Sequence, residues 1–329
     1  MDISIVVPLL NEEESIKELY DWIARVMRSN HFSYEIIFVD DGSDDGSWEI
    51  IQELSKKHPE VKALKFQLNY GKSQALNAAF KEVSGEVVIT MDADLQDNPE
   101  EIPELVRMIR EDGFDLVSGW KKKRYDSKIR KNLPSKLFNA AARKTSGLKL
   151  HDFNCGLKAY KTEVVKNVDV YGEMHRYIPV LAKNAGFHNI GEKVVQHQAR
   201  KYGTTKFGME RFINGFLDLI TINFLARFGK RPMHLFGLLG TLMFILGFGS
   251  ALYIGILKLL KLYWKEPTIL ITDNPWFYIA LSCMIIGSQF FLAGFVGELI
   301  LRSKERPSRY QVRETLNLGS TQQRKSADK

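Results

Sequence analysis

Cysteine is scarce in this chain of 329 residues, which contains only Cys155 and Cys283. Two cysteines cannot form a disulfide scaffold, and no CxxC spacing indicates a metal or redox centre. The seven histidines are scattered without HxxxH spacing, so a histidine-based metal site is not expected. The N-terminus has no basic segment before its first apolar run, which argues for a strand rather than a signal peptide.

Two long segments lack charge altogether. Residues 232–257 and 276–297 contain no Asp, Glu, Lys or Arg, and each exceeds the roughly 18–20 apolar residues that cross a bilayer as a helix. Tryptophan and tyrosine flank them, as is typical of membrane interfaces. We therefore expect a two-helix transmembrane domain over residues 232–301. Basic residues outside this pair favour cytoplasmic ends in an inner cell membrane.

The net charge is unevenly distributed. The chain carries 46 Lys and Arg against 39 Asp and Glu, a formal balance of +7. Residues 119–149 are rich in Lys and Arg and contain a single acid, Asp126. Such a block predicts an anionic partner. Nucleic acid is not favoured, because no nucleic-acid-binding module is recognisable and aromatic residues are sparse. A lipid surface or lipid phosphate is the simpler partner beside two predicted spans.

Apolar runs of strand length alternate with helical patterns in the first part of the chain. The predicted strands are 3–10, 34–43, 61–66, 85–94 and 114–120. This alternation predicts an α/β fold with a mostly parallel sheet and helices on both faces. We expect a soluble domain at 1–206, an amphipathic interfacial helix at 207–231, the membrane domain at 232–301 and a cytoplasmic tail at 302–329, disordered from Thr315.

Carboxylates follow several of these strands. Asp40 and Asp41 end one predicted strand, and Asp92 and Asp94 end another. Ligands of parallel sheets bind beyond the carboxyl ends of the strands. Side chains at i and i+2 of a regular strand point the same way, and two such carboxylates repel each other unless a cation separates them. The pattern predicts Mg²⁺ or Mn²⁺ with substrate phosphates, the alternative being a solvated turn.

Lys72 lies in "YGKSQALN", which invites a phosphate-loop interpretation. The motif requires a glycine where Phe66 stands, so this interpretation fails. Lys72 can still meet a phosphate, the alternative being an exposed surface lysine.

Six segments occur in a characteristic order along the chain. They are "VVPLLNEEESI", "IIFVDDGSDDGS", "VVITMDADLQDNPE", "LVSGWKKKR", "HDFNCGLKAY" and "ARKYGTTKFG". Together they resemble the family-2 glycosyltransferases with the GT-A fold. The sequence is most similar to the polyprenyl-phosphate glycosyltransferases, namely the bactoprenol glucosyltransferases and the dolichol-phosphate mannose synthases.

The resemblance implies an inverting, metal-dependent hexosyltransferase of cell-envelope glycan synthesis. It would move a sugar from a nucleotide-sugar to a polyprenyl phosphate at the cytoplasmic membrane face. UDP-glucose and undecaprenyl phosphate are the preferred substrates. The alternatives are GDP-mannose, a modified UDP-sugar or a hydroxyl acceptor. A membrane scaffold or flippase subunit is the non-enzyme alternative. Homotetramers occur in the family, so a homo-oligomer is allowed.

The resemblance also implies roles for individual residues. Nucleotide-sugar contacts are expected from Pro8, Leu10, Glu12, Asp40, Asp41 and Asp92, with Lys72 added as a phosphate contact. Asp92, Asp94 and Gln96 would hold the metal and diphosphate. Lys121, Arg124, Arg200 and Lys206 would meet phosphates. The catalytic set is Asp94, Asp152, Arg200 and Lys206, in which Asp152 is the candidate base. Lys121 stands where the family usually has arginine and lacks its bidentate fork.

Overall fold

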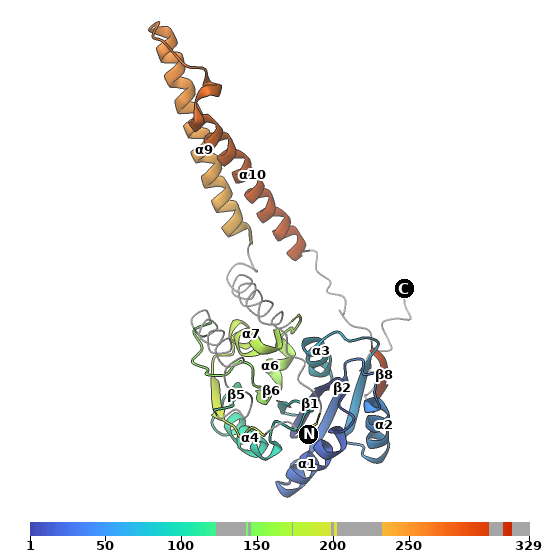
Figure 1. The fold of residues 1–329 in the computed structure, drawn as a ribbon. Coiled ribbons are helices and arrows are strands. Elements are labelled where there is room, and N and C mark those ends of the chain that lie inside the picture. Colours follow the sequence, from blue (N-terminus) through green and yellow to red (C-terminus); the bar gives the residue numbers. More distant parts are fainter. Residues whose placement is uncertain are drawn as a thin grey trace. The chain divides into compact units, whose positions relative to one another are not determined.

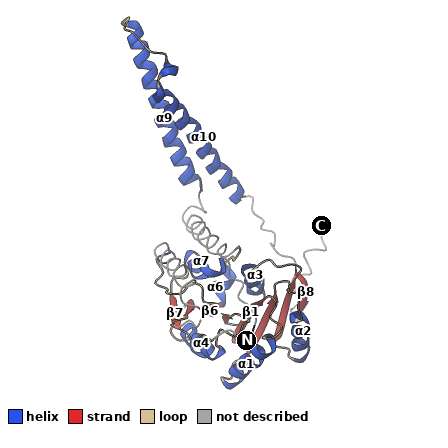
Figure 2. Ribbon diagram, in the orientation of Figure 1, coloured by secondary structure: helices blue, strands red, loops and turns tan. Residues whose placement is uncertain are grey.

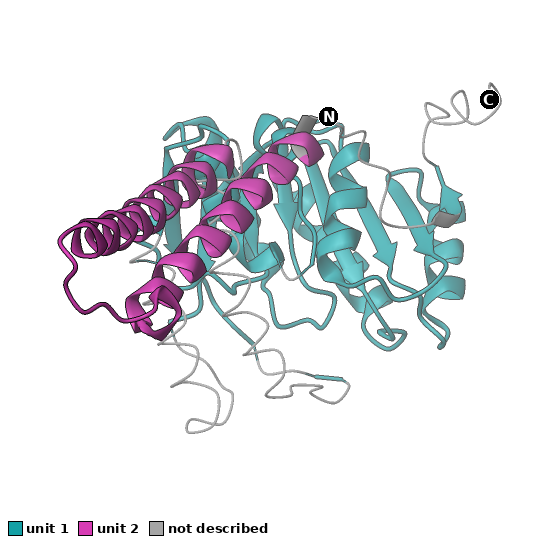
Figure 3. Ribbon diagram, turned by 90° about the horizontal axis from the view of Figure 1, so that it is seen from above, with its two compact units in different colours: residues 1–220, 308–329 teal, residues 221–307 magenta. Residues whose placement is uncertain are grey.

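The chain forms two compact units, Met1–Ile220 with Ser308–Lys329 and Thr221–Pro307 (Figure 3). The structure, a computed structural model, describes residues 1–122, 143, 146–172, 174–198, 201–202, 232–302 and 312–317. Three predicted phosphate contacts, Arg124, Arg200 and Lys206, lie outside these residues, as does the predicted interfacial helix at 207–231.

The first unit is built on a mixed sheet in the order β7-β5-β6-β4-β1-β2-β3-β8 (Figures 1 and 2). The strands are β1 (Ile3–Leu9), β2 (Tyr34–Asp40), β3 (Val61–Phe66), β4 (Val87–Thr90), β5 (Leu116–Trp120), β6 (Lys158–Lys161), β7 (Ile190–Val194) and β8 (Val312–Leu316). Strands β1 to β4 are parallel, while β6 is antiparallel to both β4 and β5. The predicted α/β fold with a mostly parallel sheet is confirmed.

Helices cover this sheet on two sides. They are α1 (Ile16–Ser29), α2 (Ser47–Lys57), α3 (Lys72–Glu82), α4 (Ile102–Arg110), α6 (Thr162–Asn167) and α7 (Ile178–Asn184), with 3-10 turns η1 (Pro99–Glu101) and η2 (Met174–Tyr177). One large apolar core joins α1, α2 and α4 to the strands. Buried side chains of α3, such as Leu76 and Phe80, lie outside that core, and Phe80 packs against Tyr160 of β6.

Strand β4 ends earlier than the sequence pattern predicts. It stops at Thr90, so Asp92 and Asp94 lie in the following loop. The argument that a regular strand points both carboxylates the same way therefore does not apply. Leu95 within this loop has a φ of 60°, an uncommon conformation for a residue with a branched side chain. The loop is consequently shaped by contacts other than the sheet ladder.

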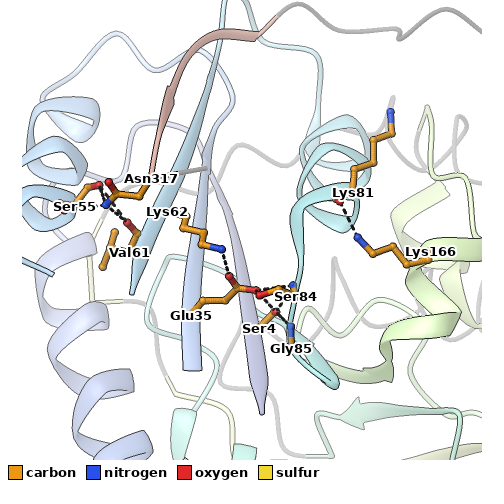
Figure 4. A network of polar contacts seen from close by, with 10 residues as sticks. All are labelled: Ser4, Glu35, Ser55, Val61, Lys62, Lys81, Ser84, Gly85, Lys166 and Asn317. Carbon is orange, nitrogen blue, oxygen red and sulfur yellow. Dashed lines mark hydrogen bonds and ion pairs between the residues drawn. The ribbon is translucent and has the colours of Figure 1, made fainter. Parts of the chain in front are cut away.

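The prediction that the tail is disordered from Thr315 is wrong at its start, because the C-terminal strand β8 reaches Leu316. Residues 315 and 316 lie in this strand, which pairs antiparallel with β3 at the sheet edge. Glu314 accepts a hydrogen bond from Trp48 Nε1 at 3.0 Å. The Asn317 amide donates to the Val61 carbonyl at 3.0 Å and to Ser55 Oγ at 2.8 Å (Figure 4). A short polar strand of this kind is stabilised by partners far away in the sequence, which a local pattern does not reveal.

The second unit is a pair of helices, α9 (Pro232–Tyr263) and α10 (Pro275–Arg302), joined through the 3-10 turn η3 (Ile271–Asp273). Both are long and apolar enough to cross a membrane. A Cβ added to Gly240 would lie 2.5 Å from the Gly287 carbonyl oxygen, and one on Gly247 equally close to that of Ala280. Small residues at these positions let the two backbones approach closely, as in membrane helix pairs.

A buried polar network lies at the start of β2. Glu35 is fully buried, and its carboxylate accepts hydrogen bonds from Ser4 Oγ and from the Ser84 backbone at 2.7 Å (Figure 4). It also pairs with the Lys62 ammonium at 2.5 Å. Burial alone would raise the pKa of Glu35, but Lys62 and the hydrogen bonds from Ser4 and Ser84 outweigh it and lower the pKa. The network thus holds a charged carboxylate inside the sheet.

We predict that Glu35→Gln lowers the free energy of unfolding by about 1–3 kcal/mol, because it removes a buried charged acceptor. Since the folded pKa of Glu35 is below its ordinary value of 4.5, its stabilising contribution is present above that pH and is lost as the pH falls through the folded pKa. Denaturant unfolding at neutral and acidic pH measures both effects. Glu53→Gln, on an exposed helix pair with Lys57, is the matched control and should change little. A wild-type-like Glu35→Gln protein would contradict the network's role.

Candidate functional site beyond the strand ends

The loop from Asp92 to Asp97 is shaped by its own carboxylates. Asp97 Oδ2 accepts the backbone N–H of Asp92 at 3.1 Å, and Asp94 Oδ1 accepts that of Gln96 at 3.2 Å. Asp94 and Asp97 are buried. Asp97 is therefore a structural residue that closes the turn, while Asp92 and Asp94 remain the candidates for ligand binding. The main chain of Gln96 also accepts a hydrogen bond from Gln198 N at 3.0 Å, which joins this loop to the segment after β7.

Asp92 is held in a cationic environment. Its Oδ1 pairs directly with the ammonium of Lys72, at the start of α3. Burial opposes ionisation of this carboxyl, but the charges of Lys72 and Lys121 outweigh it and hold the pKa of Asp92 well below its ordinary value. Lys72, predicted as a phosphate contact, therefore lies against the acidic loop in the structure. The Asp92 carboxylate is thus ionised at neutral pH.

Lys121 is held by a carboxylate in the structure. Its ammonium lies 2.8 Å from Asp97 Oδ1, and the two side chains are 11% and 0% exposed. Burial lowers the pKa of Lys121, but the Asp97 charge outweighs it and raises the pKa above its ordinary value. Lys121, the predicted phosphate contact, therefore forms an ion pair with a carboxylate of this loop. Its geometry assigns Lys121 a role in fixing the loop that carries Asp92.

The two acids at the end of β2 accept hydrogen bonds from backbone groups. Asp40 Oδ1 accepts the N–H of Ser43 at 2.8 Å. Asp41 accepts the N–H groups of Tyr70 at 2.7 Å and Gly71 at 2.9 Å, just before α3. Burial raises the pKa of Asp41 to about 6 in spite of these two hydrogen bonds. Asp41 thereby fixes the turn from which Lys72 extends.

The segment after β1 is joined to the segment after β2. Glu12 N donates to Ser47 Oγ at 3.0 Å, and Asn11 N donates to Ser43 Oγ at 2.9 Å. Leu10 is half-buried beside them. Pro8 lines a pocket with Lys72 and Asp92. The residues predicted from the first motif therefore do lie at the same sheet edge as the acidic loops.

Asp152, the candidate base, is buried and its Oδ1 accepts the backbone N–H of Asn154 at 3.0 Å. Its own N–H donates to Glu192 at 3.0 Å. Asp152 thus caps the turn that leads to Gly156. A Cβ added to Gly156 would lie 2.6 Å from Asp92 Oδ2, so this glycine lets the chain pass directly against the Asp92 carboxylate.

The donor set suits a divalent cation that is shared with a ligand. Asp92 and Asp94 supply hard carboxylate oxygens, the type that Mg²⁺ and Mn²⁺ prefer. Among the described residues, no cluster of three or more His, Cys, Asp or Glu could hold a metal by protein ligands alone. The residues fit a site of few protein ligands in which substrate phosphates complete the coordination.

Sequence reasoning missed several residues beside Asp92. The pocket there is also lined by Lys158 of β6 and by His175 and Arg176 of η2. Lys158 lies in the segment "HDFNCGLKAY", from which only Asp152 was predicted as a site residue, while His175 and Arg176 belong to none of the six segments. The apolar pattern around Lys158 was the available signal, because a lysine within a buried strand is unusual.

The sequence model of the family "Glycosyl transferase family 2" matches residues 4–169. A "dodecaprenyl-phosphate galacturonate synthase" of Rhizobium johnstonii is 33% identical over 93% of this chain and 89% of its own length. An "undecaprenyl-phosphate 4-deoxy-4-formamido-L-arabinose transferase" of Proteus mirabilis is 35% identical over 91% of this chain and 88% of its own length. Both alignments extend beyond the family match.

Solved structures share the fold of the first unit. Glucosyl-3-phosphoglycerate synthase of Mycobacterium tuberculosis, in complex with UDP, superposes with a TM-score of 0.52 at 20% identity, over 68% of this chain and 79% of that one. The same enzyme with Mn²⁺ and UDP-glucose has a TM-score of 0.50. At this identity the likeness supports the GT-A fold.

We predict that Asp97→Asn destabilises the protein by about 3–5 kcal/mol, because it leaves the Lys121 ammonium buried without its counter-ion. The double variant Asp97→Asn with Lys121→Met removes both charges and should recover part of this loss. Denaturant unfolding of the full-length protein in detergent measures the difference. The exposed Asp21→Asn on α1 is the control. Equal stability of the single and double variants would show that the pair is not coupled.

Proposed function

This chain belongs to glycosyl transferase family 2, and from that premise we propose that it transfers a sugar from a nucleotide-sugar to a polyprenyl phosphate. The observation that carries the proposal is similarity to two polyprenyl-phosphate sugar transferases along more than nine tenths of the chain. The similarity therefore covers the sheet and the two apolar helices together. The acidic loop at the strand ends supports the same reaction, because a nucleotide-sugar donor carries a diphosphate.

The identity of the sugar is the finer part of the proposal. The resemblance of the motifs favours UDP-glucose. The relatives are named for galacturonate and for 4-deoxy-4-formamido-L-arabinose. A donor screen with membranes containing undecaprenyl phosphate should therefore include UDP-glucose, UDP-galacturonate, UDP-4-deoxy-4-formamido-L-arabinose and GDP-mannose. If one of these donors yields a lipid product that mild acid cleaves, the proposal is supported. An acid-stable glycoside would instead indicate a hydroxyl acceptor.

The reaction requires little proton transfer. A phosphate oxygen of the acceptor attacks the anomeric carbon, and the bond from that carbon to the nucleoside diphosphate breaks. The leaving group takes the bonding electrons, and the configuration inverts. A phosphate monoester is already anionic near pH 7, so a general base is not needed. This agrees with Asp152, whose carboxylate accepts a backbone hydrogen bond in the turn.

Negative charge on the departing nucleoside diphosphate is the main electrostatic demand. Mg²⁺ or Mn²⁺ held by Asp92 and Asp94, with Gln96 nearby, would neutralise that charge. Lys72 lies in contact with Asp92 and is the cation of the described residues best placed to share this role. Arg124, Arg200 and Lys206 remain the proposed phosphate contacts beyond the described residues.

We assign residues 1–206 to the catalytic domain, 207–231 to an interfacial helix, 232–301 to the membrane pair and 302–329 to a C-terminal segment. The strand β8 returns to β3 after the helical pair. Two membrane crossings therefore bring the chain back to the side from which it started. The basic flanks of the pair favour the cytoplasm as that side. In this arrangement a lipid acceptor presents its phosphate at the membrane face. A homo-oligomer is compatible with the proposal.

We predict that Asp94→Ala abolishes sugar transfer, with a loss of at least about 10²–10³-fold in kcat, as for removal of an electrostatic stabiliser. Chelation of divalent cations should have a similar effect on the wild type, reversed by Mg²⁺ or Mn²⁺. A radiolabelled transfer assay measures both. Glu53→Gln is the control that should retain activity. Transfer by Asp94→Ala at the wild-type rate would refute the role of this carboxylate.

We predict that Gly156→Ala lowers transfer at least tenfold, because its methyl group would overlap the Asp92 carboxylate at 2.6 Å and displace it. The matched control is Gly249→Ala in α9, where nothing lies within 4 Å of the added Cβ. Steady-state kinetics with the thermal midpoint of each variant separates loss of the site from loss of the fold. A fully active Gly156→Ala protein would show that the position of Asp92 is not critical.

A further inference from the structure

The pocket beside Asp92 contains more positive than negative side chains. Lys72 comes from α3, Lys158 from β6, and Arg176 from η2. Asp92 is the one carboxylate among the described residues of the lining. The lining therefore carries three cationic side chains from three separate elements, of which Lys72 is paired with Asp92. Such an arrangement favours an additional anion.

Lys158 is the unusual member of this group. The residue is 3% exposed, and its ammonium donates a hydrogen bond to the carbonyl oxygen of Cys155. Among the ion pairs within 4.0 Å that the described residues form, none includes Lys158. Burial accordingly lowers the pKa of this lysine. Buried charges in proteins are normally paired or bind a ligand. Lys158 has one carbonyl as its hydrogen-bond partner among the described residues, so its ammonium group favours an anionic ligand nearby.

His175 adds a neutral hydrogen-bond donor to the same lining. Its backbone N–H donates to Ser73 Oγ at 3.0 Å, and its Nδ1 lies 3.1 Å from the same oxygen. A hydroxyl that accepts from the backbone is free to donate its proton to Nδ1, which assigns the ring proton to Nε2. Burial holds the pKa of His175 well below its ordinary value, so the ring is neutral. Ser73 thus fixes the ring as a donor without adding charge.

We propose that Lys158, His175 and Arg176 form a subsite for a phosphate group, whose oxygens are the counter-charge of the buried Lys158. Arg176 supplies a planar fork that matches phosphate geometry. Lys158 supplies a point charge, and His175 supplies the neutral donor. The subsite deepens the proposed function and rests on it for the source of the phosphate. That source is either the diphosphate of the donor or the monophosphate of the lipid acceptor.

The existence of the subsite can be tested without catalysis. Full-length protein in detergent is titrated with inorganic phosphate at constant ionic strength, with chloride as the reference, and the thermal midpoint is recorded. Phosphate should raise the midpoint of the wild type but not that of Lys158→Met. Because methionine fills a similar volume without a buried charge, the variant without phosphate should be at least as stable as the wild type.

The matched control is Lys166→Met. Lys166 also donates to a main-chain carbonyl, that of Lys81 at 2.7 Å (Figure 4), but it does not line the pocket. This control should keep the phosphate response. Should Lys158→Met fail to fold, Lys158→Gln replaces it, because glutamine retains a donor for the Cys155 carbonyl. A wild type that responds equally to phosphate and chloride, or a Lys158 variant with the full phosphate response, would overturn the subsite.

Steady-state kinetics then identifies the source of the phosphate. Removal of a charged donor should raise one KM at least about tenfold. A raised KM for polyprenyl phosphate assigns the subsite to the acceptor, and a raised KM for the nucleotide-sugar assigns it to the donor. Unchanged values of both KM and kcat would contradict the proposal. A wild type that binds phosphate but transfers no sugar would refute the proposed function and leave the subsite in place.

Discussion

Charge balance around the Asp92 carboxylate is the constraint on which the rest of the site depends. The sheet delivers this carboxylate to an edge where Lys72 pairs with it and Lys121 contributes a second positive field. Ionised carboxylates and ammonium groups are costly to bury unless they are matched. The fold meets this condition with a second pair beneath the first, between Lys121 and Asp97. The charged carboxylates of the acidic loop are therefore matched by cations at the edge of the sheet.

Several acids at this edge act on the backbone rather than on a ligand. Asp41 accepts two N–H groups ahead of α3, and Asp97 accepts that of Asp92. Their role is to position the loops that carry Lys72 and Asp92. A site that handles a diphosphate needs rigid donors and acceptors, because reorganisation during the reaction costs energy. The acids that hold the backbone and the candidate ligand-binding acids are thus parts of one arrangement.

The sequence predicted the elements that depend on local pattern. The parallel strands, the covering helices and the two apolar helices follow from periodicity and length, and the structure confirms them. It did not predict β8, because the partners of Glu314 and Asn317 lie more than 250 positions earlier in the chain. It also extended β4 through Asp94, since an apolar run gives no sign of where the ladder ends. The resemblance gave Lys121 only as a phosphate contact, because its ion pair with Asp97 is a tertiary contact that a motif does not reveal.

The distribution of positive charge explains why such contacts matter for function. Lys121 is neutralised within the protein, whereas Lys158 has only a carbonyl as its hydrogen-bond partner among the described residues. A lysine that served the fold alone would gain from a carboxylate neighbour or from replacement by an apolar side chain. Retaining a buried lysine that forms no ion pair among the described residues lowers stability in the absence of ligand. Binding of a phosphate in the proposed subsite would offset this loss of stability. Lys158 would then set both the affinity for phosphate and the stability of the ligand-free protein.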